Sequence, residues 1–399
     1  MRVLLRCFLA LLFPALAQTQ TATAPADRPI TIGRIDSLWS PTLKENRSFM
    51  VYTPPGYRQS IYQARAYPVL YLLDGDAHFH SVTGLLQFLG TGINGTYVVP
   101  EMIVVAIPNT NRTRDLTPTN APLGPDGKEV PGFKVSGGGP NFLRFLSTEL
   151  IPHIDSTMRT EPYRVLIGHS FGGIVALEAL YEMPQTFNAY VAIDPSLWWD
   201  NQRLLKQATD YFSRPALPAR TLFVGHANTL VAGDTNPNMH FKSIGDFNSF
   251  MQSGNKSGIR YGYKYYGGDD HGSVPLIAEY DALRFIFDGY KLDLTKAVKR
   301  PALISDHFAK VSAAVGYRVQ PPETMVDRIA PFDTANTIAL LQLNTELYPS
   351  SAHAFDVLGN ALLSRRDTTR ARAALDKALQ LKPDNARIKE LLSKLTMPE

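Results

Sequence analysis

A glycine-framed serine lies in the middle of the stretch "YRVLIGHSFGGIVALEAL", residues 163–180. A mostly apolar run precedes Gly168, and a run of helix-forming residues follows Gly172. This pattern around Ser170 fits a nucleophile elbow, a sharp strand-to-helix turn that lifts a serine Oγ above the carboxyl edge of a sheet. The same five residues could also form a plain tight turn, so a catalytic role for Ser170 requires partners elsewhere in the chain.

The first partner of a nucleophilic serine is a histidine base, which in this type of fold follows an acid in the chain order serine, acid, histidine. Of the nine histidines, four precede Ser170 and two lie beyond the last predicted core helix. The three that remain are His226, His240 and His271. His271 ends "YKYYGGDDH", directly after the last predicted strand, where two glycines allow a loop to place an imidazole over the serine. We therefore predict His271 as the base.

The acid that orients this base is less well defined by the sequence. Asp234 is the one carboxylate in the loop "HANTLVAGDTNPNMH", where the orienting acid is expected, although it could equally be an ordinary turn residue. Asp194, at the end of the preceding strand, is the alternative. Asp269 and Asp270 stand too close to His271 in the sequence to be preferred. The prediction is Asp234, with Asp194 held open.

Two backbone N–H groups are expected to stabilise the oxyanion. The elbow supplies one from the residue after the nucleophile, Phe171, and the loop after the third strand supplies the other. That loop is "LLDGDAHF", which makes the N–H of Asp76 the candidate.

Two adjacent tryptophans, Trp198 and Trp199, follow the strand that ends at Asp194. They could form a stacking wall for an aromatic acyl group, as substrate-binding residues, or anchor the next helix in the core. The long segment 111–140, rich in Pro and Gly, also follows a strand and is expected to be a functional loop or disordered. Its first residues, "NRTRDLTP", include Arg112 and Arg114, which could meet an anionic ligand, but solvated arginines are favoured.

The elements around these residues alternate between strand and helix. Continuous apolar runs closed by turn residues are typical of parallel strands buried on both faces. Such runs lie at 67–76, 101–110, 163–168, 187–194 and 220–225, with a further strand at 261–267. Helical stretches at 78–89, 141–158, 171–182 and 275–289 separate or follow them, and a strand pair precedes them. The sequence predicts an α/β-hydrolase fold with a mostly parallel, doubly wound sheet.

The N-terminal stretch "MRVLLRCFLALLFPALAQ" has early arginines, an apolar run and an A-x-A site, which predict a signal peptide over residues 1–17 and a secreted or periplasmic protein. Its Cys7 is the one cysteine of the chain, so the mature protein would have no cysteine-based nucleophile, disulfide or metal site. No later segment is apolar enough to predict a transmembrane helix.

The composition is that of a globular protein, with 44% hydrophobic and 19% charged residues and a formal net charge of +4. No run of lysine and arginine concentrates this charge, so nucleic-acid binding is not expected. Neither a metal nor an organic cofactor is implied by the motifs.

The C-terminal segment 330–399 has a different pattern. Its stretch 354–385 carries apolar residues, Gly359 and Pro383 at the spacing of one tetratricopeptide repeat, although any amphipathic helical hairpin is an alternative. One and a half repeats are too few for an independent solenoid. We expect this helical-repeat domain, joined by a linker at 291–329, to dock on the main domain or on a protein partner, including a second copy of the chain.

Five blocks of the sequence together resemble the Putative esterase family of α/β-hydrolases. In chain order they are "YPVLYLLDGD", "NRTRDLTP", "GHSFGG", "DPSLWW" and "DDHGSVP", and the resemblance spans residues 28–290. The family includes esterase D relatives, feruloyl and acetyl esterases, and esterases that open ferric siderophore trilactones. The resemblance implies Ser170 as nucleophile, His271 as base, and the N–H groups of Phe171 and Asp76 as oxyanion hole. Some periplasmic siderophore esterases are described as working with a Ser-His dyad, which leaves the role of Asp234 open.

The sequence therefore predicts a serine esterase that hydrolyses a small-molecule carboxylic ester through an acyl-enzyme, with siderophore-type, acyl and feruloyl esters as candidate substrates. The alternative is an inactive hydrolase fold that presents the helical repeat to a partner.

Overall fold

The computed structural model describes residues 29–395 apart from 125, 215, 231–237, 255 and 257. Backbone contacts group Ile32–Glu399 into one compact unit. The predicted signal peptide, residues 1–17, lies outside the described residues. None of the described helices combines the length and the apolar character that a membrane span requires.

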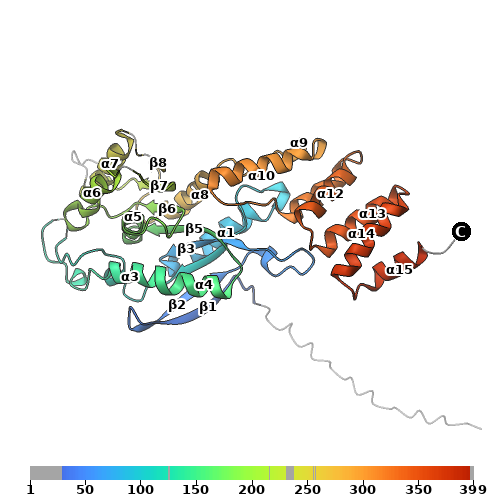
Figure 1. The fold of residues 1–399 in the computed structure, drawn as a ribbon. Helices are drawn as coiled ribbons and strands as arrows, with labels where there is room; N and C mark the ends of the chain where they lie inside the picture. The colour runs from blue at the N-terminus through green and yellow to red at the C-terminus, as the bar shows by residue number, and fades with distance from the viewer. Residues whose placement is uncertain are drawn as a thin grey trace, which may run out of the picture. The chain divides into compact units, whose positions relative to one another are not determined.

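The core of the fold is an eight-stranded sheet with the order β1-β2-β4-β3-β5-β6-β7-β8 (Figure 1). The strands are β1 (Arg34–Ser40), β2 (Glu45–Tyr52), β3 (Tyr67–Leu73), β4 (Ile103–Ile107), β5 (Thr160–His169), β6 (Ala189–Ile193), β7 (Arg220–Ala227) and β8 (Ile259–Tyr266). The first two pair in antiparallel fashion, and β2 runs antiparallel to β4. All other neighbours are parallel, which confirms the predicted mostly parallel sheet.

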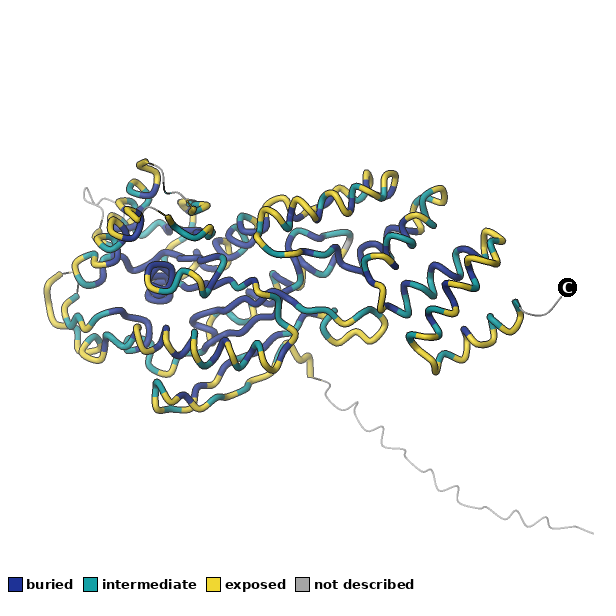
Figure 2. The backbone as a smooth tube through the Cα atoms, viewed as in Figure 1, coloured by how far each residue is buried: buried dark blue, intermediate teal, exposed yellow. Residues whose placement is uncertain are grey.

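The central strand β3 illustrates why these segments form buried strands. All seven of its residues, YPVLYLL, are buried. Leu70 and Leu72 point into one apolar cluster, whereas Tyr71 and Leu73 point into the other, because successive side chains of a strand face opposite sides of the sheet. Figure 2 shows the buried residues concentrated along the strands. A strand covered on both faces carries the continuous apolar run seen in the sequence.

Helices cover both faces of the sheet. One face packs against α1 (Gly75–Gly90) and α8 (Val274–Ile286). The helices on the other face are α3 (Gly139–Phe145), α4 (Ile151–Thr157), α5 (Phe171–Glu182), α6 (Trp199–Phe212) and α7 (Met239–Gln252). A π-helical turn, Leu146–Leu150, joins α3 to α4. This arrangement is the predicted doubly wound α/β architecture.

The segment 111–140 is mostly irregular but held in place by hydrogen bonds. Before α3 begins, its described residues form the short helix α2 (Arg112–Asp115), the 3₁₀ turn η3 (Pro131–Phe133) and one isolated bridge. The Thr117 hydroxyl accepts a hydrogen bond from the Gly137 N–H (2.9 Å), and the Ser136 hydroxyl accepts one from the Ala121 N–H (3.0 Å). These contacts fold the described part of the loop back on itself above the carboxyl edge of the sheet.

The segment 291–329, predicted as a linker, is largely helical. It forms α9 (Leu294–Lys299), α10 (Ala302–Val315) and α11 (Glu323–Ile329). Helix α10 buries Ile304, Phe308 and Val311, whose spacing of four and three residues places them on one helix face. These side chains belong to the same apolar cluster as α1 and α8, so the segment extends the core of the main domain.

The C-terminal region is helical, as predicted. Its helices are α12 (Thr337–Leu347), α13 (Ala352–Ser364), α14 (Thr368–Leu381) and α15 (Ala386–Lys394), which follow one another side by side in Figure 1. A Cβ on Gly359 would press on the Leu375 side chain, so glycine lets α13 and α14 approach closely. Leu358 and Ala371 join the apolar cluster of the main domain. That these helices are a tetratricopeptide repeat stays a prediction.

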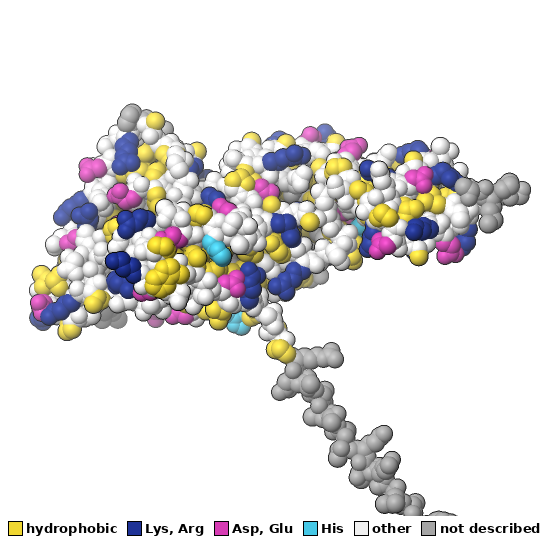
Figure 3. All heavy atoms as spheres, turned by 60° about the horizontal axis from the view of Figure 1, so that its bottom comes forward, with side chains coloured by type: hydrophobic (Ala, Val, Ile, Leu, Met, Phe, Trp, Pro, Cys, Tyr) yellow, Lys and Arg dark blue, Asp and Glu magenta, His cyan; other side chains and the backbone are white. Residues whose placement is uncertain are grey.

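The surface carries charges of both signs. On the face drawn in Figure 3, lysine and arginine side chains are interspersed with aspartate and glutamate, and apolar side chains lie between them. This face therefore presents no single-sign patch.

Candidate active site

Ser170 occupies the sharp turn between β5 and α5. Its backbone angles are φ 59° and ψ −114°, a region that costs a non-glycine residue about 1–3 kcal/mol. The turn is possible because Gly168 has no side chain: a Cβ there would overlap the carbonyl group of Gly172. The Ser170 N–H donates to the Ile193 carbonyl oxygen (2.9 Å), which ties the turn to the neighbouring strand. This is the geometry of a nucleophile elbow.

Ser170, His271 and Asp194 form a continuous chain of hydrogen bonds. His271 Nε2 lies 3.1 Å from Ser170 Oγ, and His271 Nδ1 lies 2.6 Å from Asp194 Oδ2. The three residues follow β5, β8 and β6, respectively, and parallel strands of one sheet end at the same edge. An imidazole held in this way can take the proton of the serine hydroxyl while the carboxylate stabilises the resulting imidazolium.

Asp194 is a buried carboxylate with three hydrogen-bond donors. Its side chain is fully buried. Oδ1 accepts from the Ala227 N–H (2.9 Å), and Oδ2 contacts both His271 Nδ1 (2.6 Å) and His240 Nε2 (2.8 Å). Burial alone would raise the pKa of Asp194, but the hydrogen bonds from His240, His271 and Ala227 outweigh it and hold this pKa well below its usual value. The group is therefore ionised, as an acid that orients a histidine must be.

Among the described residues, the acid that contacts His271 is the alternative, Asp194. Asp234 itself lies outside the described residues. Of the two acids next to the base, Asp270 accepts hydrogen bonds from the N–H groups of Gly272 and Ser273, and Asp269 accepts one from the Ser273 hydroxyl. Both shape the loop that carries His271, and neither is bonded to its imidazole in the described structure.

A second serine, Ser196, contacts the nucleophile and was missed by the sequence analysis. Its Oγ lies 3.2 Å from Ser170 Oγ, and its side chain is buried. The Ser196 N–H also donates to the Ser170 carbonyl oxygen (3.1 Å). A hydroxyl two residues after Asp194, at the carboxyl end of β6, is a signal that could have identified it.

The two predicted oxyanion donors lie at the starts of helices that follow adjacent strands. Phe171 is the first residue of α5, and Asp76 is the second residue of α1. Within the described residues, neither N–H donates to a backbone acceptor. The first N–H groups of a helix have no partner inside the helix, so both can remain free. The Asp76 carboxylate accepts from the Asn109 side chain (3.1 Å). Both N–H groups are thus available to a developing oxyanion.

Arg112 joins the loop of Asp76 to the strand of the nucleophile. Its guanidinium binds both carboxylate oxygens of Asp74 (2.7 and 3.0 Å) and the His169 carbonyl oxygen (3.2 Å). Asp74 precedes α1 in a left-handed conformation with φ 53°. Burial raises its pKa, but the Arg112 and Asn109 hydrogen bonds prevail and lower it. Arg112 is therefore a structural clamp rather than the solvated side chain favoured by the sequence analysis.

Comparison with known proteins identifies the group to which this geometry belongs. The Putative esterase model matches residues 40–242. Ferri-bacillibactin esterase BesA of Bacillus subtilis is 30% identical over 262 residues, which cover 60% of this chain and 85% of that protein. The chain belongs to the Putative esterase family. As an esterase by family, it is a hydrolase that acts on ester bonds.

Solved structures of similar proteins agree with this assignment. The IroE-like serine hydrolase from Shewanella oneidensis is 33% identical, with a TM-score of 0.70, over 79% of this chain and 99% of that chain. An uncharacterised protein from Capnocytophaga ochracea matches 91% of this chain and 99% of its own at 18% identity, with a TM-score of 0.56. The second likeness shows the fold alone.

The two tryptophans of this esterase have different environments. Trp199 is buried, and its indole N–H donates to the Thr119 hydroxyl (3.2 Å). Trp198 is only partly buried, and its ring centroid lies 6.2 Å from that of Phe171. The structure thus makes Trp199 a core anchor and leaves Trp198 as the tryptophan that can meet a ligand.

Trp198 lines a cavity of about 250 Å³ together with residues of the 111–140 loop, Asn201 and Met239. Asp200, Asn201 and Gln202 all have left-handed backbone angles, with φ of 47°, 52° and 60°, and such strain often marks a functional site. The Thr119 hydroxyl donates to Asp200 (2.6 Å), which fixes the strained turn to the loop. One lining residue, Met239, directly precedes His240, which contacts Asp194.

Three further ionisable groups lie near the base, with Glu279 buried and His169 and His78 partly buried. The ring centroid of His169 is 4.6 Å from that of His271, and the His78 ring is 5.9 Å from His169. Burial, with smaller contributions from the neighbouring histidines, lowers the pKa of His169 to about 4. Glu279 lies 3.5 Å from His78 Nδ1, and burial raises its pKa to about 8. The Glu279 carboxyl is therefore mostly uncharged at neutral pH and adds little negative charge near His271.

Asp194, His240 and His271 place three potential metal-ligand atoms within 4.8 Å of one another. Their contacts of 2.6 and 2.8 Å have hydrogen-bond lengths, which requires a proton between each nitrogen and the carboxylate. A metal ion would need both nitrogens free of that proton. The distances therefore fit the hydrogen-bonded arrangement.

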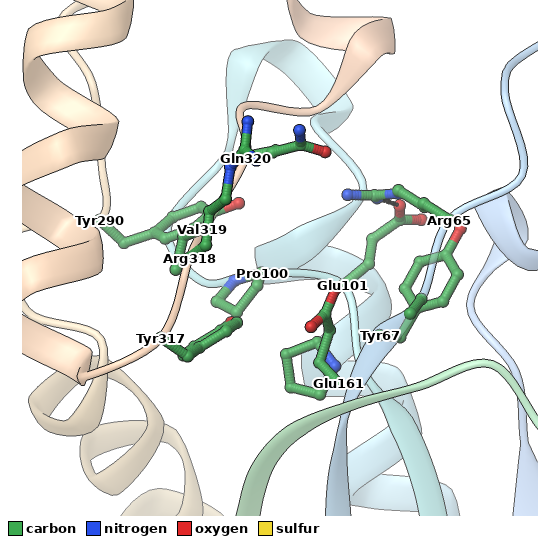
Figure 4. A pocket seen from close by; sticks show the side chains of 12 residues that line it. Arg65, Tyr67, Pro100, Glu101, Glu161, Tyr290, Tyr317, Arg318, Val319 and Gln320 are labelled. Carbon is green, nitrogen blue, oxygen red and sulfur yellow. Dashed lines mark hydrogen bonds and ion pairs between the residues drawn. The ribbon is translucent and has the colours of Figure 1, made fainter. Parts of the chain in front are cut away.

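A second cavity lies at the opposite edge of the sheet. It measures about 270 Å³ and is lined by residues at the amino ends of β3 and β5, including Tyr67 and Glu161 (Figure 4). An ion pair between Arg65 and Glu101 closes one side, and Tyr317 faces it from the other. Because Ser170 stands at the carboxyl edge, this cavity is separate from the nucleophile.

Proposed function

We propose that this esterase is a serine hydrolase that cleaves carboxylic esters through an acyl-enzyme, with Ser170 as nucleophile, His271 as base and Asp194 as the orienting acid. The observation that carries the proposal is the hydrogen-bond chain from Ser170 Oγ through His271 to the buried Asp194. Ester hydrolysis by such a chain needs no metal or organic cofactor.

In the first step, Ser170 Oγ bonds to the ester carbonyl carbon while its proton passes to His271 Nε2. The carbonyl oxygen gains negative charge and accepts hydrogen bonds from the Phe171 and Asp76 N–H groups. Removing one such donor typically costs about 3 kcal/mol of transition-state stabilisation. The intermediate collapses as the carbon–oxygen bond to the alcohol breaks, and the alcohol leaves with the proton from His271.

In the second step, water attacks the acyl-serine. His271 Nε2 accepts the proton of the attacking water, and the same N–H groups hold the oxyanion again. The bond to Ser170 then breaks, Ser170 Oγ recovers a proton from His271, and the carboxylic acid departs. Each proton taken by the imidazole is returned, so the enzyme is regenerated.

The proposed substrate class is a siderophore-type ester. This proposal is supported by the 30% identity to a ferri-bacillibactin esterase and by the cavity beside Trp198. The partly exposed Trp198 ring offers a flat apolar face, on which an aromatic acyl group can stack. Feruloyl and simple acyl esters are the competing substrates.

The alternative is an inactive scaffold that acts through its C-terminal helices. The strained Ser170, the bonded His271 and the two free N–H groups favour the enzyme, because a scaffold has no need to keep all of them together. Labelling by a fluorophosphonate probe separates the two possibilities, since it requires an activated serine.

The decisive experiment compares the wild-type chain with Ser170→Ala on a panel of trilactone, feruloyl, acetyl-sugar and activated small esters. We expect the wild type to hydrolyse at least one of them and to react with the fluorophosphonate, and S170A to do neither while keeping its melting temperature. Unchanged turnover in S170A would overturn the assignment of the nucleophile. Turnover of simple esters without any trilactone hydrolysis would overturn the substrate class alone.

A further inference from the structure

Asp194 shares one carboxylate oxygen between two histidines. Oδ2 lies 2.6 Å from His271 Nδ1 and 2.8 Å from His240 Nε2. The two imidazole rings also meet edge to face, with centroids 5.0 Å apart at an interplanar angle of 90°. His240 therefore contacts both Asp194 and His271, the pair that would activate Ser170. It does not contact the serine itself in the described structure.

The buried carboxylate depends on its donors. Asp194 has no solvent exposure, so a missing hydrogen bond cannot be replaced by bulk water at low cost. Its Oδ1 has the backbone N–H of Ala227 (2.9 Å), whereas Oδ2 has only the two imidazoles among the described groups. Without His240, the position of Oδ2 would be set by His271 alone, which is the group that Oδ2 is required to orient.

The chain carries His240 on a rigid support. It is the second residue of α7, and the Asn238 side chain caps this helix by accepting from the Phe241 N–H (2.9 Å). Further along, Ile244 and Phe247 are fully buried against the sheet. A helix fixed at its start and along its buried face holds the His240 ring in place.

We propose that His240 is a positioning residue: its Nε2–H donates to Asp194 Oδ2 and so holds the carboxylate, and through it the His271 ring, in the orientation that serves Ser170. This inference rests on the proposed function of Ser170, His271 and Asp194. His240 contributes to the rate of the chemical step and not to the binding of the ester. The reaction sequence itself is unchanged.

The test uses two substitutions of His240 and a remote control in the full chain. His240→Phe removes the donor and keeps a ring, whereas His240→Gln keeps an N–H at a similar distance from the backbone. The control is His307→Phe, because His307 lies on helix α10 and, among the described residues, bonds to the Tyr290 carbonyl oxygen (2.9 Å) instead of Asp194. Melting temperatures show whether each variant folds.

We expect H240F to lower kcat about tenfold to a hundredfold, the range of a lost hydrogen bond to a charged group, with KM nearly unchanged. H240Q should recover most of that loss, and H307F should match the wild type. Equal kcat for H240F and wild type would overturn the proposal. An increase in KM with unchanged kcat would also overturn it, by making His240 a substrate-binding residue.

A double-mutant cycle with Asp194→Asn keeps the test valid if H240F is less stable. Because His240 acts through Asp194, adding H240F to D194N should reduce kcat by less than threefold, a failure of additivity typical of coupled groups. An equal loss in both backgrounds would show that His240 acts independently of Asp194, against the proposal.

A chelator distinguishes the hydrogen-bonded arrangement from a metal site. We expect EDTA and added Zn²⁺ to leave the wild-type kcat unchanged at equal ionic strength, whereas loss with EDTA and recovery with Zn²⁺ would assign the three residues to a metal instead. Failure of the proposed function would look different from any of these results, because the wild type itself would then hydrolyse no ester on the panel.

Discussion

His271 Nδ1 lies 2.6 Å from Asp194 Oδ2, and this contact joins residues 77 positions apart. Loss of the negative charge on Asp194 should therefore disable His271 as the base. We expect Asp194→Asn to lower kcat by up to about 10⁴-fold, since an amide favours the wrong imidazole tautomer, while Asp234→Asn keeps most of the activity. Steady-state kinetics of both variants on one activated ester provide the measurement. A large loss of kcat in D234N together with an active D194N would make Asp234 the orienting acid instead.

Asp194 shows what the sequence could and could not decide. Both aspartates follow strands that end at the same sheet edge, so order along the chain leaves them equivalent. The choice is made by contacts between segments far apart, including the Ala227 N–H on the adjacent strand β7. The sequence marks His240 only as a candidate base, because its contact with Asp194 depends on how α7 packs. The contact between Ser170 and His271 fits their order in the sequence, because each follows a recognisable strand.

The fold was easier to predict than the contacts of its polar residues. Strands buried on both faces leave continuous apolar runs, and these located the parallel sheet. The helical segment 294–329 was missed although Ile304, Phe308 and Val311 carry a helical spacing that could have revealed it. Arg112 and Arg114 lie in a polar loop, and their ion pairs with Asp74 and Glu45 leave no local pattern in the sequence.

Arg112 should matter for catalysis without touching substrate, because it positions the loop of Asp76. In Arg112→Lys, a single ammonium cannot reproduce the two-pronged contact with Asp74 and the bond to the His169 carbonyl oxygen. We expect kcat to fall about tenfold or more. Arg114→Lys is the matched control, since Arg114 pairs with Glu45 and Asp115 instead. Equal kinetic effects of both substitutions would contradict a specific role for Arg112.

Glu279 should make the stability of the protein depend on pH. Burial raises its pKa from 4.5 to about 8, so between these values the folded state binds more protons than the unfolded state and stability falls as pH rises. Glu279→Gln cannot ionise, so its free energy of unfolding relative to wild type should increase from pH 5 to pH 8.5, by at most about 5 kcal/mol. Denaturant titrations at several pH values test this, with the exposed Glu182→Gln as control. A difference that stays constant with pH would refute the expectation.

Gly168 should not tolerate any side chain. In Gly168→Ala the Cβ would overlap the Gly172 carbonyl group. Relieving this overlap requires the backbone at residue 168 or 172 to move, and either movement would displace Ser170. We expect loss of soluble protein or of activity. Gly84→Ala is the control, because a Cβ at this position in α1 meets nothing within 4 Å and should stabilise the helix by about 0.5–1 kcal/mol. An active and stable G168A would show that the elbow is less tightly packed than described.

The two tryptophans allow stability and substrate binding to be separated. Trp199→Ala removes a buried ring and its hydrogen bond to Thr119, and should cost about 3–5 kcal/mol of unfolding free energy. Trp198→Ala removes a partly exposed ring that lines the cavity, and should leave the melting temperature nearly unchanged. If an aryl acyl group stacks on Trp198, KM for a feruloyl or catecholate ester should rise more than KM for an acetyl ester. Equal changes in KM for both esters would place the aromatic group elsewhere, and the cavity beside Asn201 would then bind another part of the substrate.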